Sequence, residues 1–244
     1  MRNPALPAAL SSLSVRAGDA VEMMDTPDCD PGRLWRTYSD FRYVNAVVSG
    51  LRATYRRDIR PLLSRHVMRS LLDVGSGGGD VARAIARWAA RDGFLLHITA
   101  IDPDQRAHAY AASRPVVPGI TFRRVFSADL VAEGQRFDVV ISNHILHHLS
   151  PEELGGLLFD SEQLALRRAL HGDIERSRPA YFGFWLGTLP LFRGSYIRTD
   201  GLTSIRRSYA AAELRPVLPA GWRLTREAPS RLMLRWEAPR TTDA

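Results

Sequence analysis

The sequence predicts an α/β fold built on a parallel sheet. Short apolar runs, clearest at 70–74 and 137–142, alternate with amphipathic segments of helical period. Such alternation produces parallel strands with helices on both faces, because each connection must cross back over the sheet. The 244 residues are 45% hydrophobic and 24% charged, which suits one soluble domain with a sizeable core.

The expected elements follow one another in a regular order. Helical spacing predicts a segment over 34–63 that is broken near Ser49 and Gly50. Strands are expected over 70–74, 95–101, 121–125, 137–142 and 168–174, with helices over 80–91, 104–112 and 151–166 between them. A helix that begins near Ser208 or Tyr209 and two closing strands, 222–227 and 232–237, complete the domain.

This order divides the chain into a tail and one domain. Residues 1–32 are rich in Ala, Pro and Ser, which predicts a flexible N-terminal tail. Residues 33–244 form the domain, with a helical cover over 33–66, a core over 67–175, a lid-like insertion over 176–207 and a C-terminal helix and strand pair over 208–244.

The net charge of +7 comes from arginine alone, since the sequence contains no lysine. A basic balance raises the question of a nucleic-acid partner, but the arginines are scattered in doublets such as Arg56-Arg57. We therefore expect a solvated surface and no nucleic-acid partner. One cysteine, Cys29, excludes an internal disulfide, and residues 1–20 lack a secretory signal, so we expect a cytoplasmic protein.

A glycine-rich turn follows the first expected strand. Residues 71–80 read LLDVGSGGGD, so a strand turns through glycines into a helix and presents backbone N–H groups to a ligand. The dinucleotide-binding pattern GxGxxG is broken, because Asp80 takes its sixth position. An acid at this helix start would repel a pyrophosphate, but not a zwitterion that carries an amino group and a sulfonium.

The turn resembles the first motif of the class I S-adenosylmethionine-dependent methyltransferases, with Asp73, Gly75, Gly77 and Gly79 in the matching positions. Three further stretches resemble later motifs of that family: 100–104 (AIDPD), 126–130 (FSADL) and 137–149 (FDVVISNHILHHL). The last is similar to small-molecule methyltransferases of the ubiquinone-biosynthesis type. The resemblance implies a Rossmann-like, doubly wound, seven-stranded sheet with its last strand antiparallel, an N-terminal helical cover and an insertion after the fifth strand.

The resemblance also implies S-adenosyl-L-methionine as the cofactor. In the family, the glycine turn holds its amino-acid part, an acid after the second strand takes the ribose hydroxyls, and an acid in the third motif takes the adenine amino group. Carried over to this sequence, the cofactor-binding residues are Asp73, Gly75, Ser76, Gly77, Gly79, Asp102, Pro103, Ala128, Asp129, Leu130, Asn143 and His144.

Methyl transfer to a hydroxyl is an in-line displacement that benefits from a base near the attacking oxygen. His171 and Asp173 lie two apart on the expected fifth strand, so their side chains face the same side, near the substrate. We assign them, with His144, as catalytic candidates. For His147 and His148, packing and helix entry are favoured over catalysis. No metal is expected, because clustered Asp and Asn ligands are lacking.

An apolar stretch, 180–192 (AYFGFWLGTLPLF), lies between Arg178 and Arg193. It is too short to cross a bilayer, so we expect it to cover the substrate pocket and to make peripheral membrane contact. Aromatic residues of the two covers are expected either to line an apolar pocket or to form core: Tyr38, Phe41, Tyr181, Phe184 and Trp185.

These features together predict an S-adenosylmethionine-dependent methyltransferase of secondary metabolism. Its expected acceptor is a small aromatic, polyketide-like or quinone-like molecule, with O-methylation favoured over C- or N-methylation. Two alternatives stay open: a methyltransferase acting on nucleic acid or protein, and an S-adenosylmethionine-binding protein without transfer activity. A nicotinamide oxidoreductase is disfavoured by Asp80.

Overall fold

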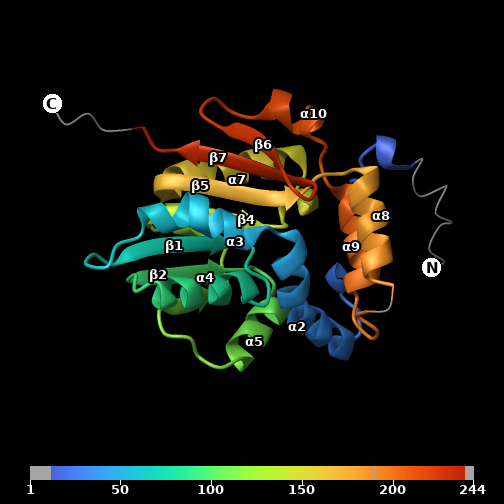
Figure 1. The fold of residues 1–244 in the computed structure, drawn as a ribbon, viewed down its shortest axis with the longest axis horizontal. Helices are drawn as coiled ribbons and strands as arrows, with labels where there is room; N and C mark the ends of the chain where they lie inside the picture. Colours follow the sequence, from blue (N-terminus) through green and yellow to red (C-terminus); the bar gives the residue numbers. More distant parts are fainter. Residues whose placement is uncertain (1–11, 190, 240–244) are drawn as a thin grey trace.

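The computed structural model describes residues 12–189 and 191–239, and a seven-stranded sheet runs through it in the order β3-β2-β1-β4-β5-β7-β6 (Figure 1). The strands are β1 (Arg69–Val74), β2 (Leu96–Ile101), β3 (Ile120–Arg123), β4 (Phe137–Asn143), β5 (Ala165–Ile174), β6 (Arg223–Glu227) and β7 (Arg231–Glu237). Strand β7 pairs antiparallel with β5 and β6, whereas the other pairs are parallel. The Rossmann-like sheet with one antiparallel strand is confirmed.

The parallel register sets where the polar side chains gather. Asp73 pairs with Ala100 of β2 and with Ile141 of β4, so β1, β2 and β4 end at nearly the same level. The residues that follow each strand therefore meet at one edge of the sheet, which is the usual place for ligands in such folds. Strands β1 and β4 are buried over nearly their whole length, as their apolar runs predict.

Helices cover both faces of the sheet. One face carries α3 (Leu51–Thr54), a π-helical turn (Tyr55–Ile59), a 3-10 turn (Arg60–Leu62) and α4 (Asp80–Arg91), and the other carries α6 (Ser127–Ala132), α7 (Pro151–Leu164), α10 (Ala211–Leu214) and a 3-10 turn (Arg215–Val217). Helix α5 (Gln105–Ser113) packs on α2 (Pro31–Val48). The expected break after α2 is confirmed at Gly50, whose φ of 55° suits glycine and whose missing Cβ leaves room for the Arg231 guanidinium.

The N-terminal part of the described chain corrects the expectation of a tail over residues 1–32. Residues 1–11 lie outside the described residues, but residues 12–30, called the strap below, run across the domain through 3-10 turns at Ser12–Ser14 and Met23–Asp25. Leu13, Glu22 and Cys29 are buried. The composition of the strap suggested mobility, whereas Leu13 packs with Tyr181 and Leu202, and Arg16 and Glu22 form hydrogen bonds to residues far along the chain.

The insertion after β5 folds into two helices, α8 (Arg178–Gly187) and α9 (Ile197–Arg207), which pack on each other. Figure 1 shows them side by side at the end of the sheet toward which β5 points. The chain then returns through α10 to the strand pair β6 and β7. Among the described residues, no helix has the length and apolar character that a membrane crossing requires.

Candidate functional site

A cavity of about 390 Å³ lies at the carboxyl edge of the sheet. Its walls come from α2, the glycine turn after β1, the loops after β2 and β4, the strap, and the insertion helices α8 and α9. The acids that line it are Glu22, Asp25, Asp73, Asp80, Asp102, Asp104 and Asp200, and the histidines are His144, His147 and His148. A cavity with this excess of carboxylates suits a ligand that carries positive charge.

The glycine turn adopts the conformation that its sequence predicts. Gly75, Gly77 and Gly79 all have positive φ, and a Cβ on Gly77 would meet no atom within 4 Å. A Cβ on Gly75, by contrast, would lie 2.6 Å from Ile145, so glycine is required there for packing. The Gly77 N–H donates to Asp102 at 2.8 Å, which joins the turn to the tip of β2. Bare backbone thus borders the cavity at Gly77.

Three carboxyl groups stand close together beneath this turn. Burial and mutual repulsion raise the pKa of Asp73 well above its usual range, and burial raises the pKa of Asp80 and of Asp102. Among the described residues, Asp73 Oδ2 has no hydrogen-bond partner. A buried carboxylate oxygen without a partner is costly unless a ligand satisfies it. The group therefore fits a ligand with an ammonium and a second positive charge, as S-adenosylmethionine has.

The N-terminal helix contributes a residue to this part of the site that no sequence motif indicated. Asn45 of α2 donates to Asp80 at 2.9 Å, and its side-chain oxygen accepts from Asn143 at 3.5 Å. Asn45 therefore links the helix start after the glycine turn to the end of β4. Pro103, Asn143, His144 and Ser76 also line the cavity, as the resemblance implies.

The third motif lies apart from this cavity. Asp129 accepts from the Phe126 N–H at 2.8 Å and so caps α6, while Leu130 is fully buried in the core. Neither of them, nor Ala128, is among the residues that line the cavity. Their contact with the adenine ring stays a prediction.

His171 was expected to face substrate, and this prediction is wrong. Its side chain is fully buried, stacks on Trp222, and lies 2.7 Å from Ser142 Oγ and 3.0 Å from Ser161 Oγ. Burial lowers its pKa to about 3, so the ring is neutral. Residues two apart on a strand do share a face, as expected. His171, however, lies further from the carboxyl end of β5 than Asp173, and its side chain does not reach the cavity.

Asp173 lies behind the cavity wall and holds two histidines. Its carboxylate accepts from the His147 N–H at 2.8 Å, lies 2.9 Å from His147 Nδ1, and lies 3.5 Å from His144 Nδ1. Desolvation opposes the charge on Asp173, but His147 and His144 outweigh it and lower the pKa of this carboxyl. The catalytic candidates Asp173 and His144 are therefore brought together, while His171 is not part of this group.

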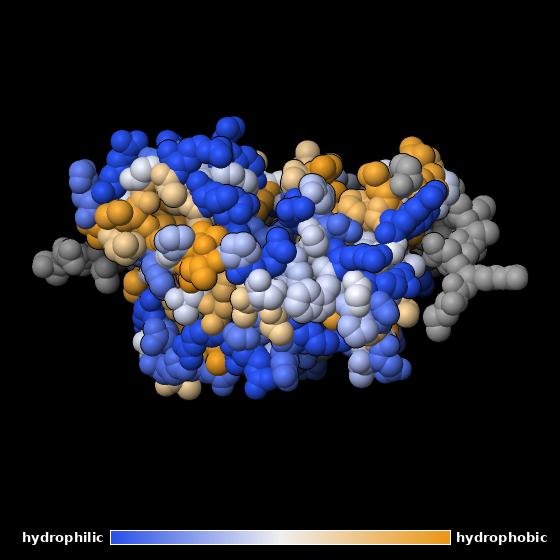
Figure 2. Space-filling view, turned by 90° about the horizontal axis from the view of Figure 1, so that it is seen from below, coloured by the Kyte–Doolittle hydropathy of each residue, from blue (hydrophilic) through white to orange (hydrophobic). Residues whose placement is uncertain are grey.

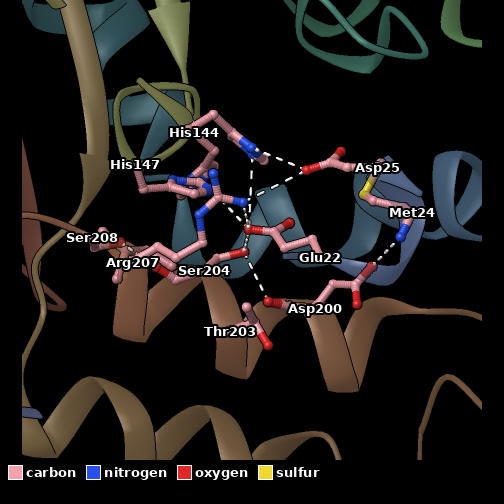
Figure 3. Close-up of polar contacts among 12 residues, drawn as sticks. Glu22, Met24, Asp25, His144, His147, Asp200, Thr203, Ser204, Arg207 and Ser208 are labelled. Atoms are coloured by element: carbon pink, nitrogen blue, oxygen red, sulfur yellow. Dashed lines mark hydrogen bonds and ion pairs between the residues drawn. The ribbon is translucent and has the colours of Figure 1, made fainter. Parts of the chain in front are cut away.

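His147 continues the chain of contacts into the strap (Figure 3). Its Nε2 lies 3.4 Å from Glu22 Oε1, and the ring is 3% exposed. Although burial disfavours a charged ring, Asp173 and Glu22 raise the pKa of His147 to about 10. His147 is therefore a buried cation between two carboxylates.

Helix α9 supplies further polar side chains around Glu22. Ser204 Oγ donates to Glu22 Oε1 at 2.9 Å, and Arg207 Nη1 lies 3.6 Å from both Glu22 and Asp25. Glu22, His147 and His148 also place one potential metal-ligand atom each within 4.8 Å of one another. Such donors suit a divalent cation, although Arg207 already supplies positive charge there. That the protein uses no metal stays a prediction.

The aromatic residues of the covers divide between pocket and core. Tyr38, Phe41 and Phe184 line the cavity. Tyr181 is buried among residues of the strap and α9, with Trp185 packed against this cluster. The insertion therefore both closes the cavity and forms a small core of its own.

Comparisons with known proteins agree with this geometry. Residues 71–163 match the family model described as "Methyltransferase domain". The ubiquinone biosynthesis O-methyltransferase of Rhizobium etli is 27% identical over 116 residues, which cover 42% of this chain and 43% of that protein. The protein of the same name from a Methylobacterium species is 32% identical over 87 residues, covering 33% of this chain and 31% of its own. The chain thus matches less than half the length of these two relatives.

Solved structures extend the likeness of the fold to most of the chain. The plantazolicin methyltransferase BpumL, in complex with a pentazolic desmethylPZN analog and SAH, aligns over 96% of this chain and 98% of its own with a TM-score of 0.58 and 12% identity. The magnesium protoporphyrin IX methyltransferase of Synechocystis PCC 6803 with bound SAH aligns over 84% and 86%, with a TM-score of 0.54 and 16% identity.

The fold and the acid-lined glycine turn define an S-adenosylmethionine-binding protein of the Rossmann-like type. Residues 71–163 match the methyltransferase domain, and the fold around them is that of class I S-adenosylmethionine-dependent methyltransferases.

Proposed function

We propose that the protein transfers a methyl group from S-adenosylmethionine to a hydroxyl of a small aromatic or quinone-like molecule. This proposal rests mainly on one observation: the same cavity is bounded by two walls of different chemistry. One wall is the glycine turn with its unpartnered carboxylate at Asp73. The other is apolar and aromatic, apart from the polar cluster around His147.

The first wall suits the cofactor. Asp73 and Asp80 supply carboxyl groups near the turn, whose ionised form a positively charged ligand would stabilise. Asp102 lies at the tip of β2, where a carboxylate can take ribose hydroxyls. When bound, S-adenosylmethionine supplies an activated methyl group. The chain's own part is to hold it, to align the acceptor with it, and to exclude water.

The second wall suits a flat molecule with a polar edge. Tyr38, Phe41 and Phe184 offer apolar surface, and the strap and η5 (Leu146–His148) offer polar groups at one end. Asp173 acts from behind this wall as a positioning residue for His147 and His144, because Asp173 is 3% exposed and does not line the cavity, whereas His144 does. The Rhizobium etli and Methylobacterium relatives are named as O-methyltransferases, which supports methylation on oxygen.

Two measurements test this function. Calorimetric titration should show binding of S-adenosylmethionine and S-adenosylhomocysteine and no binding of NADH. Radiolabelled S-adenosylmethionine should then label a hydroxylated member of a panel of phenols, catechols, hydroxyquinones, aromatic amines, oligonucleotides and a basic peptide. Label appearing only in oligonucleotide or peptide would favour the macromolecular alternative, and binding without any transfer would favour a non-catalytic protein.

We also propose that α8 makes peripheral membrane contact, as an acceptor with a lipid tail would require. Phe182, Leu186, Leu189 and Leu191 are 45–52% exposed, and Figure 2 shows hydrophobic residues gathered at the end of the molecule where α8 lies. Such a group marks an interaction surface. The variant Leu186→Asp should lose sedimentation with anionic vesicles. Val116→Asp, at a 90% exposed site between α5 and β3, should keep it; equal sedimentation of both variants would contradict the proposal.

A further inference from the structure

The strap is fixed across the cavity at several points, so Glu22 is held in place. Arg16 donates to the carbonyl oxygens of His147 and Leu149 at 3.1 and 2.9 Å. On the other side, Asp200 of α9 accepts from the N–H groups of Met23 and Met24 at 3.0 and 2.9 Å. The residue between these anchors, Glu22, is 3% exposed and lines the cavity.

The carboxylate of Glu22 is bonded on one side. Its polar contacts with described residues are all made by Oε1, with Ser204 Oγ at 2.9 Å, His147 Nε2 at 3.4 Å, Arg207 Nη1 at 3.6 Å and His148 Nε2 at 3.9 Å. Burial opposes ionisation of Glu22, but its contacts with His147 and His148 outweigh burial and lower the pKa of this carboxyl. Glu22 is therefore an oriented, ionised carboxylate at the cavity wall. Its Oε2 takes part in none of these four contacts.

The histidines around the cavity are less suited to take a proton. His147 is already protonated, and its two nitrogens face Asp173 and Glu22 at 2.9 and 3.4 Å. His144 lines the cavity and turns Nδ1 toward Asp173, while its Nε2 is buried and has no hydrogen-bond partner among the described residues. His148 faces Asp25 with Nδ1 at 3.3 Å and Glu22 with Nε2 at 3.9 Å, and His171 is sealed in the core.

We propose that Glu22, delivered by the strap, is a catalytic carboxylate that accepts the proton of the acceptor hydroxyl during methyl transfer, with His147 and Asp173 as positioning residues behind it. This proposal rests on the proposed function. As the oxygen–methyl bond forms, the sulfur–methyl bond breaks and its electron pair stays on sulfur as a neutral thioether. The hydroxyl proton passes to Glu22, which becomes a neutral carboxylic acid and later returns the proton to solvent.

The charge balance of this step suits a closed cavity. One sulfonium charge and one carboxylate charge disappear together, so no new charge is created where water is scarce. The sulfonium also favours the ionised form of Glu22 before transfer, and its loss favours the neutral form afterwards. A carboxylate can therefore serve here although it is a weak base in water.

The test compares Glu22→Gln with Glu22→Asp and with Asp19→Asn, an exposed acid of the same strap. With the hydroxylated acceptor from the panel, Glu22→Gln should lower turnover by about 10²–10⁴-fold, and Glu22→Asp should restore part of it. The dissociation constant of S-adenosylhomocysteine should stay within about twofold of wild type in all three variants. That of S-adenosylmethionine should rise roughly three- to tenfold in Glu22→Gln alone, because a nearby negative charge is lost.

Turnover of Glu22→Gln within threefold of wild type would overturn the proposal. Loss of binding to both cofactor forms in Glu22→Gln would also overturn it, since Glu22 would then be a residue of the cofactor site. If wild type binds S-adenosylmethionine but methylates no member of the panel, the proposed function fails. The ratio of the dissociation constants of S-adenosylmethionine and S-adenosylhomocysteine then tests the position of Glu22. An unchanged ratio in Glu22→Gln would mean that Glu22 does not lie near the methyl group.

Discussion

The region around His171 and the region around His147 are buried to the same degree, yet they hold their rings in opposite states. His171 is surrounded by Ser142, Ser161 and Trp222, which carry no charge, and its pKa falls to about 3. His147 lies between Asp173 and Glu22, and its pKa rises to about 10. Burial alone therefore does not decide the charge of a histidine; the charge of its partners does. The first region is core, and the second borders a site.

The largest effect is expected from removing the charge that holds His147. Asp173→Ala should lower the free energy of unfolding by about 3–5 kcal/mol, because it leaves His147 buried without its main partner. Urea denaturation at pH 7 measures this. A loss below about 1 kcal/mol would show that the His147 region is no more charged than the His171 region.

A second test uses pH and the opposite shifts of the two rings. Between pH 6.5 and 3, the unfolded chain protonates His171 and the native state does not, so native stability falls as the pH falls. The contribution is about 1.4 kcal/mol per pH unit, or roughly 3 kcal/mol between pH 6.5 and 4.5. Native His147 instead keeps a proton that the unfolded chain loses above pH 6.5, so its stabilising contribution is lost as the pH rises toward 10.

Urea denaturation of wild type and His171→Gln from pH 4.5 to 7.5 isolates the contribution of His171 to the free energy of unfolding. The variant should be less stable at pH 7.5 but should show a smaller decline toward acid than wild type. Parallel curves for the two proteins would mean that His171 is protonated in the native state, and the contrast between the two regions would disappear.

The smallest effect concerns the neutral hydrogen bonds of His171. Ser161 donates to the Leu157 carbonyl at 2.7 Å, so His171 Nε2–H is the donor to Ser161 and Ser142 is the donor to Nδ1. Ser161→Ala leaves one buried N–H without a partner and should cost about 1–2 kcal/mol in thermal or urea unfolding. Methyl transfer should be unchanged; reduced turnover would connect the His171 region to the site.

The cofactor side of the site could be predicted from the sequence because it is built from consecutive residues. The turn at 75–79 and Asp102 follow directly after strands that the apolar pattern predicts, and parallel pairing brings them to one edge. The α/β class, the succession of strands along the chain after residue 67 and the helix break at Gly50 follow from the same local signals.

The acceptor side could not be predicted in the same way. Glu22 and Asp200 come from two separate segments, and neither stands in a pattern that indicates its partners; the same holds for Asn45 beside the glycine turn. The alternation of side chains along a strand correctly placed His171 and Asp173 on one face of β5. It does not show how far each residue lies from the end of the strand. His171 pairs with Ser142 inside the sheet, whereas Asp173 lies past the last residue that pairs with β4.

The docking of the strap has a consequence for the time at which the site is completed. Asp200 and Arg207, which hold this segment, are synthesised 178 and 185 residues after Glu22. At about 5–20 residues per second, the segment waits on the order of ten to forty seconds for these partners. Such distant pairings slow the closing steps of folding. Strands β1 to β5 and the glycine turn, which all precede α8, can therefore pair well before the acceptor wall exists.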